Sequence, residues 1–228
     1  MAAGRLPEIT LKPDLAINTV LPSQIYTIDD FFSSAEVKAV RRWTDSVVME
    51  DPKPAGKGAA ERTARRGSLD SPDIAAILLN LLLPYIPQLS PAYTPTSKDG
   101  RPLLSPNIRV YHYPAKSYFR CHYDSPTLDP ASRRLSCWTI LIYLSDVQGG
   151  ATAFYTSTHD TRDSKNSNAK LRSKTNKGLS DEKKISVEPK AGRMLLHWHG
   201  MKNGGCLKHE GEEVVKGDKW VLRTDLLA

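Results

Sequence analysis

The second half of the chain, from about residue 105 onward, is a series of short segments with strand-like composition, separated by turn residues. Gly149-Gly150 and the Pro-Lys-Ala-Gly stretch at 189–192 are two of these turns. Eight short strands that follow two helices favour two antiparallel sheets packed face to face, the jelly-roll arrangement. The predicted strands are 108–113, 118–123, 136–144, 152–155, 185–187, 194–198, 205–209 and 220–227.

The first half is expected to be mainly helical. Residues 1–22 have the composition of an extended lead-in, and a short strand begins at Tyr26. Ser33 and Glu36 form a capping box, in which each side chain accepts a hydrogen bond from the backbone N–H of the other residue. A helix is therefore predicted to begin here and to fade near Glu50.

A second helix is predicted after a polar loop at 51–68, which is rich in proline, glycine and arginine. Ser71 is a suitable N-cap, and Pro72 occupies the first helical position, where no N–H is needed. The body of this helix is apolar on nearly every side and ends at Pro84. Such a helix must be buried on more than one side, so we expect it to pack on a sheet.

Together these elements predict an α+β fold: a double-stranded β-helix, or jelly roll, with N-terminal helices packed on one of its sheets. A chain of 228 residues can form one large domain, and no internal repeat is visible. We therefore expect a single domain over 1–228, with helical support in residues 1–104 and the jelly-roll core in residues 105–228.

One segment, residues 156–184, carries much of the positive charge. The chain has 32 Lys and Arg against 25 Asp and Glu, a net charge of +7, and this segment holds eight basic and four acidic residues. Because it has almost no apolar residues, a solvated loop inserted between two strands is the favoured interpretation. A contact to a polyanion or an acidic substrate is the alternative. We expect this loop to help select the substrate.

Several classes of protein are disfavoured by the sequence. The longest apolar run, at 74–83, is too short to span a membrane. No basic stretch followed by an apolar stretch is visible at the N-terminus, so no secretory signal is expected. The three cysteines form no Cys-x-x-Cys pair, and an odd number argues against a disulfide framework. A reducing compartment, the cytoplasm or the nucleus, is therefore expected.

The histidines offer one arrangement suited to a metal ion. His122-Tyr123-Asp124 is the only His-x-Asp sequence, and alternation along a strand would direct both side chains to one face. This motif arises easily by chance, but His209 is followed by a glycine-containing turn and by a strand that carries Lys219. Two imidazoles and one carboxylate on adjacent strands would leave three positions of an octahedral Fe(II) open.

Five stretches occur in the order and spacing of a known family: 122–124, 136–145, 149–154, 192–196 and 209–219. With these stretches, the region from residue 108 to the end resembles the Fe(II)- and 2-oxoglutarate-dependent dioxygenases of the prolyl 4-hydroxylase-like branch. Residues 26–48 resemble it more faintly. The resemblance implies an oxidoreductase that couples decarboxylation of 2-oxoglutarate and activation of O2 at non-haem Fe(II) to hydroxylation of a C–H bond.

The resemblance also implies roles for individual residues. The positions of the iron ligands are those of His122, Asp124 and His209. Lys219 stands where the family places the basic residue that binds the distal carboxylate of 2-oxoglutarate, and Arg223, on the same strand face, is an alternative for this role. Tyr113 and Tyr143 resemble positions that hydrogen-bond the co-substrate. Ascorbate is expected as a reductant.

The substrate stays open at this stage. The family implies a peptidyl prolyl residue or another amino-acid-like or small-molecule substrate. Two alternatives are a non-catalytic jelly-roll binding module and a dioxygenase that acts on nucleic acid through its basic surface. Since no aromatic platform or nucleic-acid motif is apparent, nucleic acid is the less favoured partner.

Four further residues receive simpler interpretations. His197 and His199 lie on one face of a predicted strand and compete with His209 for the third ligand position, although a structural or pocket-lining role is favoured for both. Cys121 and Cys137 are interpreted as buried small apolar residues.

Overall fold

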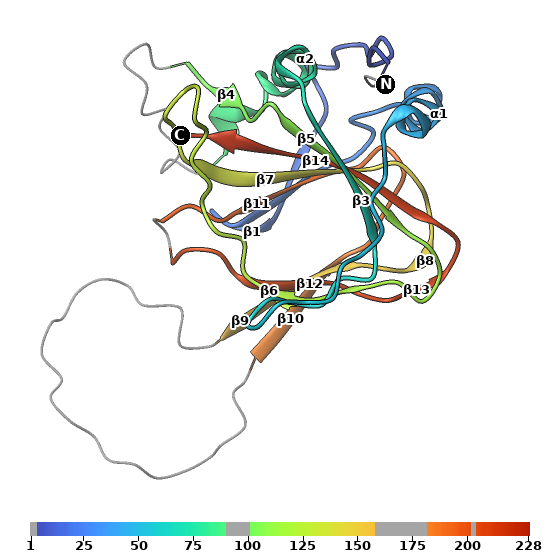
Figure 1. Cartoon of the computed structure of the whole chain (residues 1–228). Coiled ribbons are helices and arrows are strands. Elements are labelled where there is room, and N and C mark those ends of the chain that lie inside the picture. The colour runs from blue at the N-terminus through green and yellow to red at the C-terminus, as the bar shows by residue number, and fades with distance from the viewer. Residues whose placement is uncertain (1–3, 90–100, 158–181, 202–203) are drawn as a thin grey trace, which may run out of the picture.

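The computed structural model describes residues 4–89, 101–157, 182–201 and 204–228. These residues form two antiparallel sheets that face each other, and two helices that lie on the outer side of the larger sheet (Figure 1). The protein is thus an α+β jelly roll with its helices on one sheet, as the sequence predicts. None of the described helices is long and apolar enough to cross a membrane.

The larger sheet has eight strands, in the order β1-β2-β11-β7-β14-β5-β3, with β4 paired to β14. These strands are β1 Ile17–Leu21, β2 Ile25–Ile28, β3 Arg65–Asp70, β4 Leu103–Leu104, β5 Asn107–Tyr113, β7 Ser136–Tyr143, β11 Met194–Trp198 and β14 Lys219–Leu227. The last strand of the chain, β14, lies in the middle of the sheet between β5 and β7. Residues before position 104 therefore supply strands as well as helices.

The smaller sheet has four strands in the order β10-β9-β12-β6. They are β6 Phe119–His122, β9 Thr152–Ser157, β10 Glu182–Val187 and β12 Lys208–Gly211, and a separate pair is formed by β8 Gln148–Gly149 and β13 Val214–Lys216. All eight predicted strands are confirmed, with ends shifted by at most three residues. The predicted basic loop falls between the paired strands β9 and β10, and its residues 158–181 lie outside the described residues.

Both helices begin at the N-caps that the sequence indicates. They are α1 Ser34–Trp43 and α2 Pro72–Leu82, and a short 3-10 helix, η2, follows at Ile86–Gln88. The hydroxyl of Ser33 accepts from the N–H of Glu36, and the carboxylate of Glu36 accepts from the N–H of Ser33, so the predicted capping box is present. The hydroxyl of Ser71 likewise accepts from the N–H of Ile74.

The first helix ends earlier than predicted. It was expected to continue toward Glu50, but α1 stops at Trp43 and a single 3-10 turn, η1 (Thr44–Ser46), follows. The hydroxyl of Thr44 donates to the carbonyl of Arg41, and the hydroxyl of Ser46 donates to that of Trp43. These side chains occupy carbonyls that a continuing helix would use, which explains the early end.

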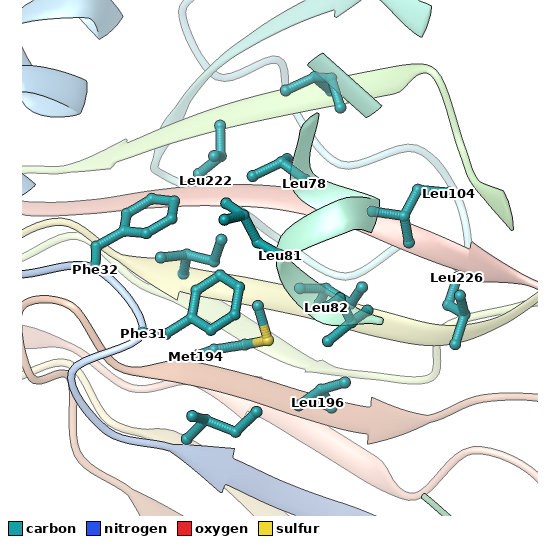
Figure 2. Packing of buried hydrophobic residues seen from close by; sticks show 14 of the residues in the cluster. Phe31, Phe32, Leu78, Leu81, Leu82, Leu104, Met194, Leu196, Leu222 and Leu226 are labelled. Carbon is teal, nitrogen blue, oxygen red and sulfur yellow. The ribbon is translucent and has the colours of Figure 1, made fainter. Parts of the chain in front are cut away.

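The apolar helix α2 packs on the larger sheet, as predicted. Leu78 and Leu82 are buried in one apolar cluster with Leu104 of β4 and Leu222 of β14 (Figure 2). Complete burial of a leucine side chain contributes roughly 1.5–3 kcal/mol relative to exposure, so this contact is a major source of stability. It also holds the middle of the larger sheet from its outer side.

The loop predicted at 51–68 is partly wrong, because residues 65–70 form strand β3 at the edge of the larger sheet. The segment shows no alternation of buried and exposed residues, since Gly67 is its one buried residue. Gly67 is required there: a Cβ at this position would lie 2.5 Å from Cγ1 of Val47 and 2.8 Å from the carbonyl oxygen of Val48. The close approach of Val47 and Val48 thus leaves no room for a side chain at this position of the strand.

Alternation along β14 divides the buried residues into two groups. Trp220 and Leu222 point toward the helices and belong to the larger apolar cluster. Val221 belongs to the smaller cluster, which lies between the two sheets. Lys219 and Arg223 share the face of Val221, because successive side chains of a strand point to opposite sides. Polar residues are therefore enclosed between the sheets.

Candidate active site

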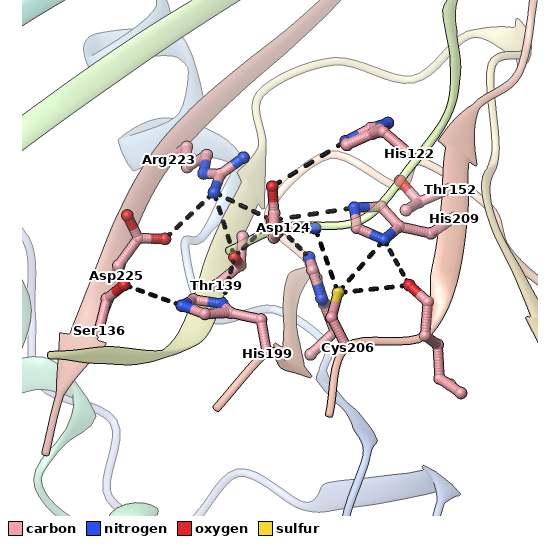
Figure 3. A network of polar contacts seen from close by, with 12 residues as sticks. His122, Asp124, Ser136, Thr139, Thr152, His199, Cys206, His209, Arg223 and Asp225 are labelled. Atoms are coloured by element: carbon pink, nitrogen blue, oxygen red, sulfur yellow. Dashed lines mark hydrogen bonds and ion pairs between the residues drawn. The ribbon is translucent and has the colours of Figure 1, made fainter. Parts of the chain in front are cut away.

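The smaller sheet brings three of the predicted site residues together. His122 is the last residue of β6, Asp124 follows two residues later, and His209 lies on β12 directly opposite His122. Nε2 of His209 lies 3.8 Å from Oδ2 of Asp124, and Nε2 of His122 lies 4.0 Å from Oδ1 (Figure 3). One ligand atom from each of the three residues lies within 4.8 Å of the other two.

The other nitrogen of each imidazole is held by the backbone. Nδ1 of His122 lies 2.8 Å from the carbonyl oxygen of Arg120, and Nδ1 of His209 lies 2.8 Å from that of Leu207. A carbonyl only accepts hydrogen bonds, so Nδ1 carries the proton in both rings and the lone pair of Nε2 faces Asp124. Burial lowers the pKa of His122, and it lowers the pKa of His209 to about 4, so both rings are neutral near pH 7.

Asp124 is held as a carboxylate by residues of the larger sheet. Burial alone would raise its pKa, but Arg223 and the nearby imidazoles keep the pKa well below the usual value. Nη2 of Arg223 donates to Oδ2 at 3.0 Å, and the hydroxyl of Thr139 donates to the same oxygen at 2.8 Å (Figure 3). Two neutral imidazoles and one charged carboxylate thus converge, which is a donor set that binds divalent cations.

A lysine lies deeper between the sheets. Lys219, the first residue of β14, is 3% exposed, and its Nζ donates to the carbonyl oxygen of Gly150 at 2.6 Å. The rings of Tyr113 and Tyr143 flank it, with their centroids 5.1 and 5.5 Å from Nζ. Burial lowers the pKa of Lys219 to about 8. The pocket lined by His122 and His209 is also lined by Lys219, so an anionic ligand could span the two ends.

The two cations of β14 have different surroundings. Arg223 is paired with Asp124 and also lies 3.3 Å from Oδ1 of Asp225, whereas the Nζ of Lys219 has a backbone carbonyl as its hydrogen-bond partner. The two residues are four positions apart, about 13 Å along a strand. Arg223 is therefore engaged beside the carboxylate of Asp124, and Lys219 lies at the far end of the pocket.

Comparison with known proteins relates this arrangement to a family. The sequence matches the 2OG-Fe(II) oxygenase superfamily over residues 108–224, slightly more than half of the chain. The chain belongs to this superfamily. It is an Fe(II)- and 2-oxoglutarate-dependent dioxygenase, an oxidoreductase. A comparison with curated protein sequences finds no significant match.

Three solved structures illustrate the fold of this 2OG-Fe(II) oxygenase. The viral collagen prolyl hydroxylase of Paramecium Bursaria Chlorella virus-1, in complex with 2-oxoglutarate, has 15% identity and a TM-score of 0.54, over 90% of this chain and 96% of that chain. The prolyl hydroxylase of Trichoplax adhaerens, with a hypoxia inducible factor peptide, has 16% identity and a TM-score of 0.56, and the match covers 91% of this chain and 86% of that chain. HygX of Streptomyces hygroscopicus, with nickel and 2-oxoglutarate bound, has 16% identity and a TM-score of 0.53, and the match covers 90% of this chain and 82% of that chain.

The two tyrosines predicted beside the co-substrate of the oxygenase have different positions. Tyr113 is the last residue of β5 and lines the pocket. Tyr143 is the last residue of β7 and is fully buried, and its hydroxyl lies 2.7 Å from Oγ1 of Thr152, which itself lines the pocket. Burial raises the pKa of both phenols, so both are neutral. Sequence reasoning missed Thr152, because no local pattern links it to Tyr143.

The two histidines of β11 also have different positions. Nδ1 of His199 lies 3.0 Å from Oγ1 of Thr139, and its Nε2 lies 2.9 Å from Oγ of Ser136 (Figure 3). These bonds agree with the structural role predicted for His199. His197 lines the pocket, and its Nε2 lies 3.6 Å from Oδ2 of Asp124. The pocket therefore contains a third imidazole.

The cysteines differ in part from the prediction. Cys137 is buried, as predicted, and its thiol donates to the carbonyl of Leu226. Cys121 is exposed, so its prediction as a buried residue is wrong; it lies at β6, the edge strand of the smaller sheet, where it is open to solvent. Cys206 was not singled out, yet its Sγ accepts from the N–H of Asp124 at 3.3 Å and lies 3.7 Å from Nδ1 of His209.

Proposed function

We propose that this dioxygenase hydroxylates a peptidyl prolyl residue, or another amino-acid-like or small-molecule substrate. In this proposal His122, Asp124 and His209 hold Fe(II), and Lys219 binds the distal carboxylate of 2-oxoglutarate. The observation that carries it is the convergence of two Nε2 lone pairs and one carboxylate beside a pocket that is lined by both imidazoles and by a buried lysine. When bound, Fe(II) and 2-oxoglutarate supply the activation of O2 and the oxidising power for hydroxylation.

The residues around the proposed ligands each have a defined task in this proposal. The carbonyls of Arg120 and Leu207 orient the two imidazoles so that Nε2 faces the cation. Arg223 and Thr139 hold one oxygen of Asp124 and thereby leave the other for the metal. Arg223 is thus a positioning residue, and Lys219 is the residue that we assign to the distal carboxylate.

The far end of the pocket is arranged for one carboxylate. Lys219 supplies a positive charge, and burial strengthens its attraction to an anion because little water competes. The hydroxyl of Thr152, held by the phenol of Tyr143, and the phenol of Tyr113 are the hydrogen-bond donors that we assign to the same ligand. A single lysine gives a point charge rather than a two-pronged contact, so these donors would fix the orientation of the carboxylate.

Two features support a ring-containing or peptidyl substrate. Phe119 stacks on the imidazole of His122 with 3.8 Å between centroids, and Tyr123, between the proposed ligands, is 63% exposed. Aromatic side chains such as these offer an apolar surface to a pyrrolidine or sugar ring. Collagen and a hypoxia inducible factor peptide appear in the names of two similar structures, and hygromycin B is bound in one structure of HygX, so peptides and small molecules are both included.

The remaining sequence-based expectations stay predictions. Ascorbate as a reductant is tested by its effect on the number of turnovers before inactivation. The selection of substrate by residues 156–184 is tested by replacing 158–181 with a short linker; unchanged substrate KM and scope would contradict it. The expected location in the cytoplasm or nucleus is tested by imaging the tagged chain in its own cells. A nucleic-acid substrate is tested by including oligonucleotides in the substrate screen.

The deciding experiment is an anaerobic titration of the protein with Fe(II) and 2-oxoglutarate. We expect the weak visible charge-transfer band of an iron–keto-acid complex, and succinate formation once O2 is admitted. His122→Ala and Asp124→Ala should abolish the band, whereas His112→Ala, at a histidine paired with Asp218 away from the pocket, should retain it. A screen of proline peptides, free amino acids and hygromycin B then identifies the substrate class by succinate release above background. A band that survives both ligand variants would contradict the proposal.

A further inference from the structure

A second group of metal-ligating side chains adjoins the proposed iron site. His197, Cys206 and His209 each offer one ligand atom within 4.8 Å of the other two. His197 lies on β11 of the larger sheet, and Cys206 lies in the segment just before β12. The proposed function gives a task to His209 but none to His197 or Cys206, so this group needs its own explanation.

The distance between Cys206 and His209 matches that between two ligands of a tetrahedral metal site. Zn–S and Zn–N bonds of about 2.3 and 2.0–2.1 Å at a tetrahedral angle place sulfur and nitrogen about 3.6 Å apart. The distance from Sγ of Cys206 to Nδ1 of His209 is 3.7 Å (Figure 3). The ring of His197 lies 4.6 Å from the ring of His209 between centroids. The three ligand atoms are thus near one another, and a cation between them requires the bond from Nδ1 of His209 to the carbonyl of Leu207 to open.

The donor atoms select a different kind of cation from the proposed iron site. Two imidazoles and a carboxylate suit Fe(II), whereas a thiolate with two imidazoles suits Zn2+ or copper. We propose that His197, Cys206 and His209 form a second binding position for a thiophilic cation such as Zn2+, and that its occupation excludes Fe(II) from the position formed by His122, Asp124 and His209. The second half of this statement rests on the proposed function.

Exclusion follows from the chemistry of the shared residue. The nitrogen of His209 nearest to Sγ of Cys206 is Nδ1, which carries a proton and donates to the carbonyl of Leu207. The second position would therefore take the lone pair of Nδ1 only after this proton has moved to Nε2, where the proposed iron site needs a lone pair. A neutral imidazole has one nitrogen lone pair, so it serves one cation at a time. Two divalent cations bound to the two nitrogens of one ring would also repel each other strongly, because the ring would hold them close together. Binding at the second position releases the thiol proton of Cys206 to the solvent.

Cobalt(II) is the probe for the first half of the proposal. The apo protein is titrated with Co2+ under anaerobic, thiol-free conditions, and absorbance is followed in the near ultraviolet, where a thiolate–cobalt charge-transfer band appears. We expect a one-equivalent band in the natural protein and in Asp124→Ala. The band should be lost in Cys206→Ser and unchanged in the matched control Cys121→Ser. In His197→Gln the affinity for Co2+ should fall at least tenfold. Far-ultraviolet circular dichroism verifies that each variant is folded.

Competition between Zn2+ and Fe(II) tests the second half. One equivalent of Zn2+ should raise the Fe(II) concentration needed for the iron–2-oxoglutarate band at least tenfold in the natural protein, and much less in Cys206→Ser. Two results of the cobalt titration would overturn the first half. If the cobalt band is absent, or persists in Cys206→Ser, there is no second position.

If Asp124→Ala removes the cobalt band, Cys206 is an additional ligand of a single site. Equal competition in Cys206→Ser would overturn exclusion through the shared histidine, and absence of the iron band in the natural protein would refute the proposed function instead.

Discussion

Nη2 of Arg223 lies 3.0 Å from Oδ2 of Asp124, and the same nitrogen lies 3.3 Å from Oδ1 of Asp225. All three side chains are almost enclosed. Removing one member of a buried ion pair leaves an uncompensated charge and destabilises a protein by roughly 3–5 kcal/mol. Arg223→Met should therefore lower the free energy of unfolding in urea by about this amount. Arg65→Met, which removes an exposed pair with Asp51, should change it by less than about 1 kcal/mol.

The roles of the two cations on β14 can be separated by binding. Lys219→Met removes the proposed carboxylate partner and should weaken 2-oxoglutarate binding by roughly 30-fold or more, as expected for the loss of one partner of a buried charge pair. Arg223→Lys keeps a positive charge beside Asp124 and should change the 2-oxoglutarate Kd by less than about threefold. Anaerobic calorimetry with metal-loaded protein measures both. The opposite order of effects would assign the distal carboxylate to Arg223.

Lys219 should also reduce the stability of the apo protein. Its pKa is 10.5 in the absence of burial and about 8 in the fold, so at pH 7 the folded state holds a proton at a cost of roughly 3 kcal/mol, partly offset by the bond to Gly150. Lys219→Met should raise the free energy of unfolding by on the order of 2 kcal/mol. Because the unfolded chain alone binds the proton between pH 8 and pH 10.5, this gain should shrink across that range. A loss of stability at pH 7 would contradict the argument.

The same pKa predicts how co-substrate binding depends on pH. Only the protonated form of Lys219 attracts a carboxylate, and this form decreases as the pH rises through about 8. The apparent Kd of 2-oxoglutarate should therefore be nearly constant below pH 7.5 and should rise roughly tenfold by pH 9. Lys219→Arg remains charged throughout and serves as the control, with a flat profile over this range. A flat profile in the natural protein would show that binding does not need this ammonium group.

A glycine in the turn before β11 tests the fold independently of the chemistry. Gly192 has φ +85°, and a Cβ there would lie 2.2 Å from the carbonyl oxygen of Phe32. Gly192→Ala should lower the free energy of unfolding by roughly 3 kcal/mol or more, because backbone strain and a clash with backbone add. Gly58 has φ +79° but no neighbour within 4 Å, so Gly58→Ala should show the backbone effect alone, about 1 kcal/mol. Equal effects of the two substitutions would contradict the clash.

Features that depend on neighbouring residues could be predicted from the sequence. The capping box of Ser33 and Glu36 and the N-cap Ser71 involve residues three positions apart, and both are present. His122 and Asp124 were recognised for the same reason, since two residues on one side of a strand end point the same way. The spacing between His209 and Lys219 was also recognised, because the two residues are separated by a short stretch of chain that contains one turn and leads into one strand.

Features that depend on distant pairing could not be predicted. Strand β3 pairs with β5 about forty residues later and has no alternation of its own. Arg223 and Asp124 are 99 residues apart in the sequence, so the ion pair that engages Arg223 has no local signal. The contact of Cys206 with His209 and Asp124 depends on how the segment before β12 turns, which no sequence pattern determines.

Strand β14 presents Trp220 and Leu222 to the helices and Lys219 and Arg223 to the pocket. A shift of one residue in its pairing would exchange these faces, leaving two charges among leucines and removing the cation from the ligand. Molecules with this error would therefore be unstable and, if Lys219 holds the distal carboxylate as proposed, unable to bind the keto acid. Stoichiometric binding of 2-oxoglutarate would consequently count the correctly folded molecules in a preparation, without any separate measure of conformation.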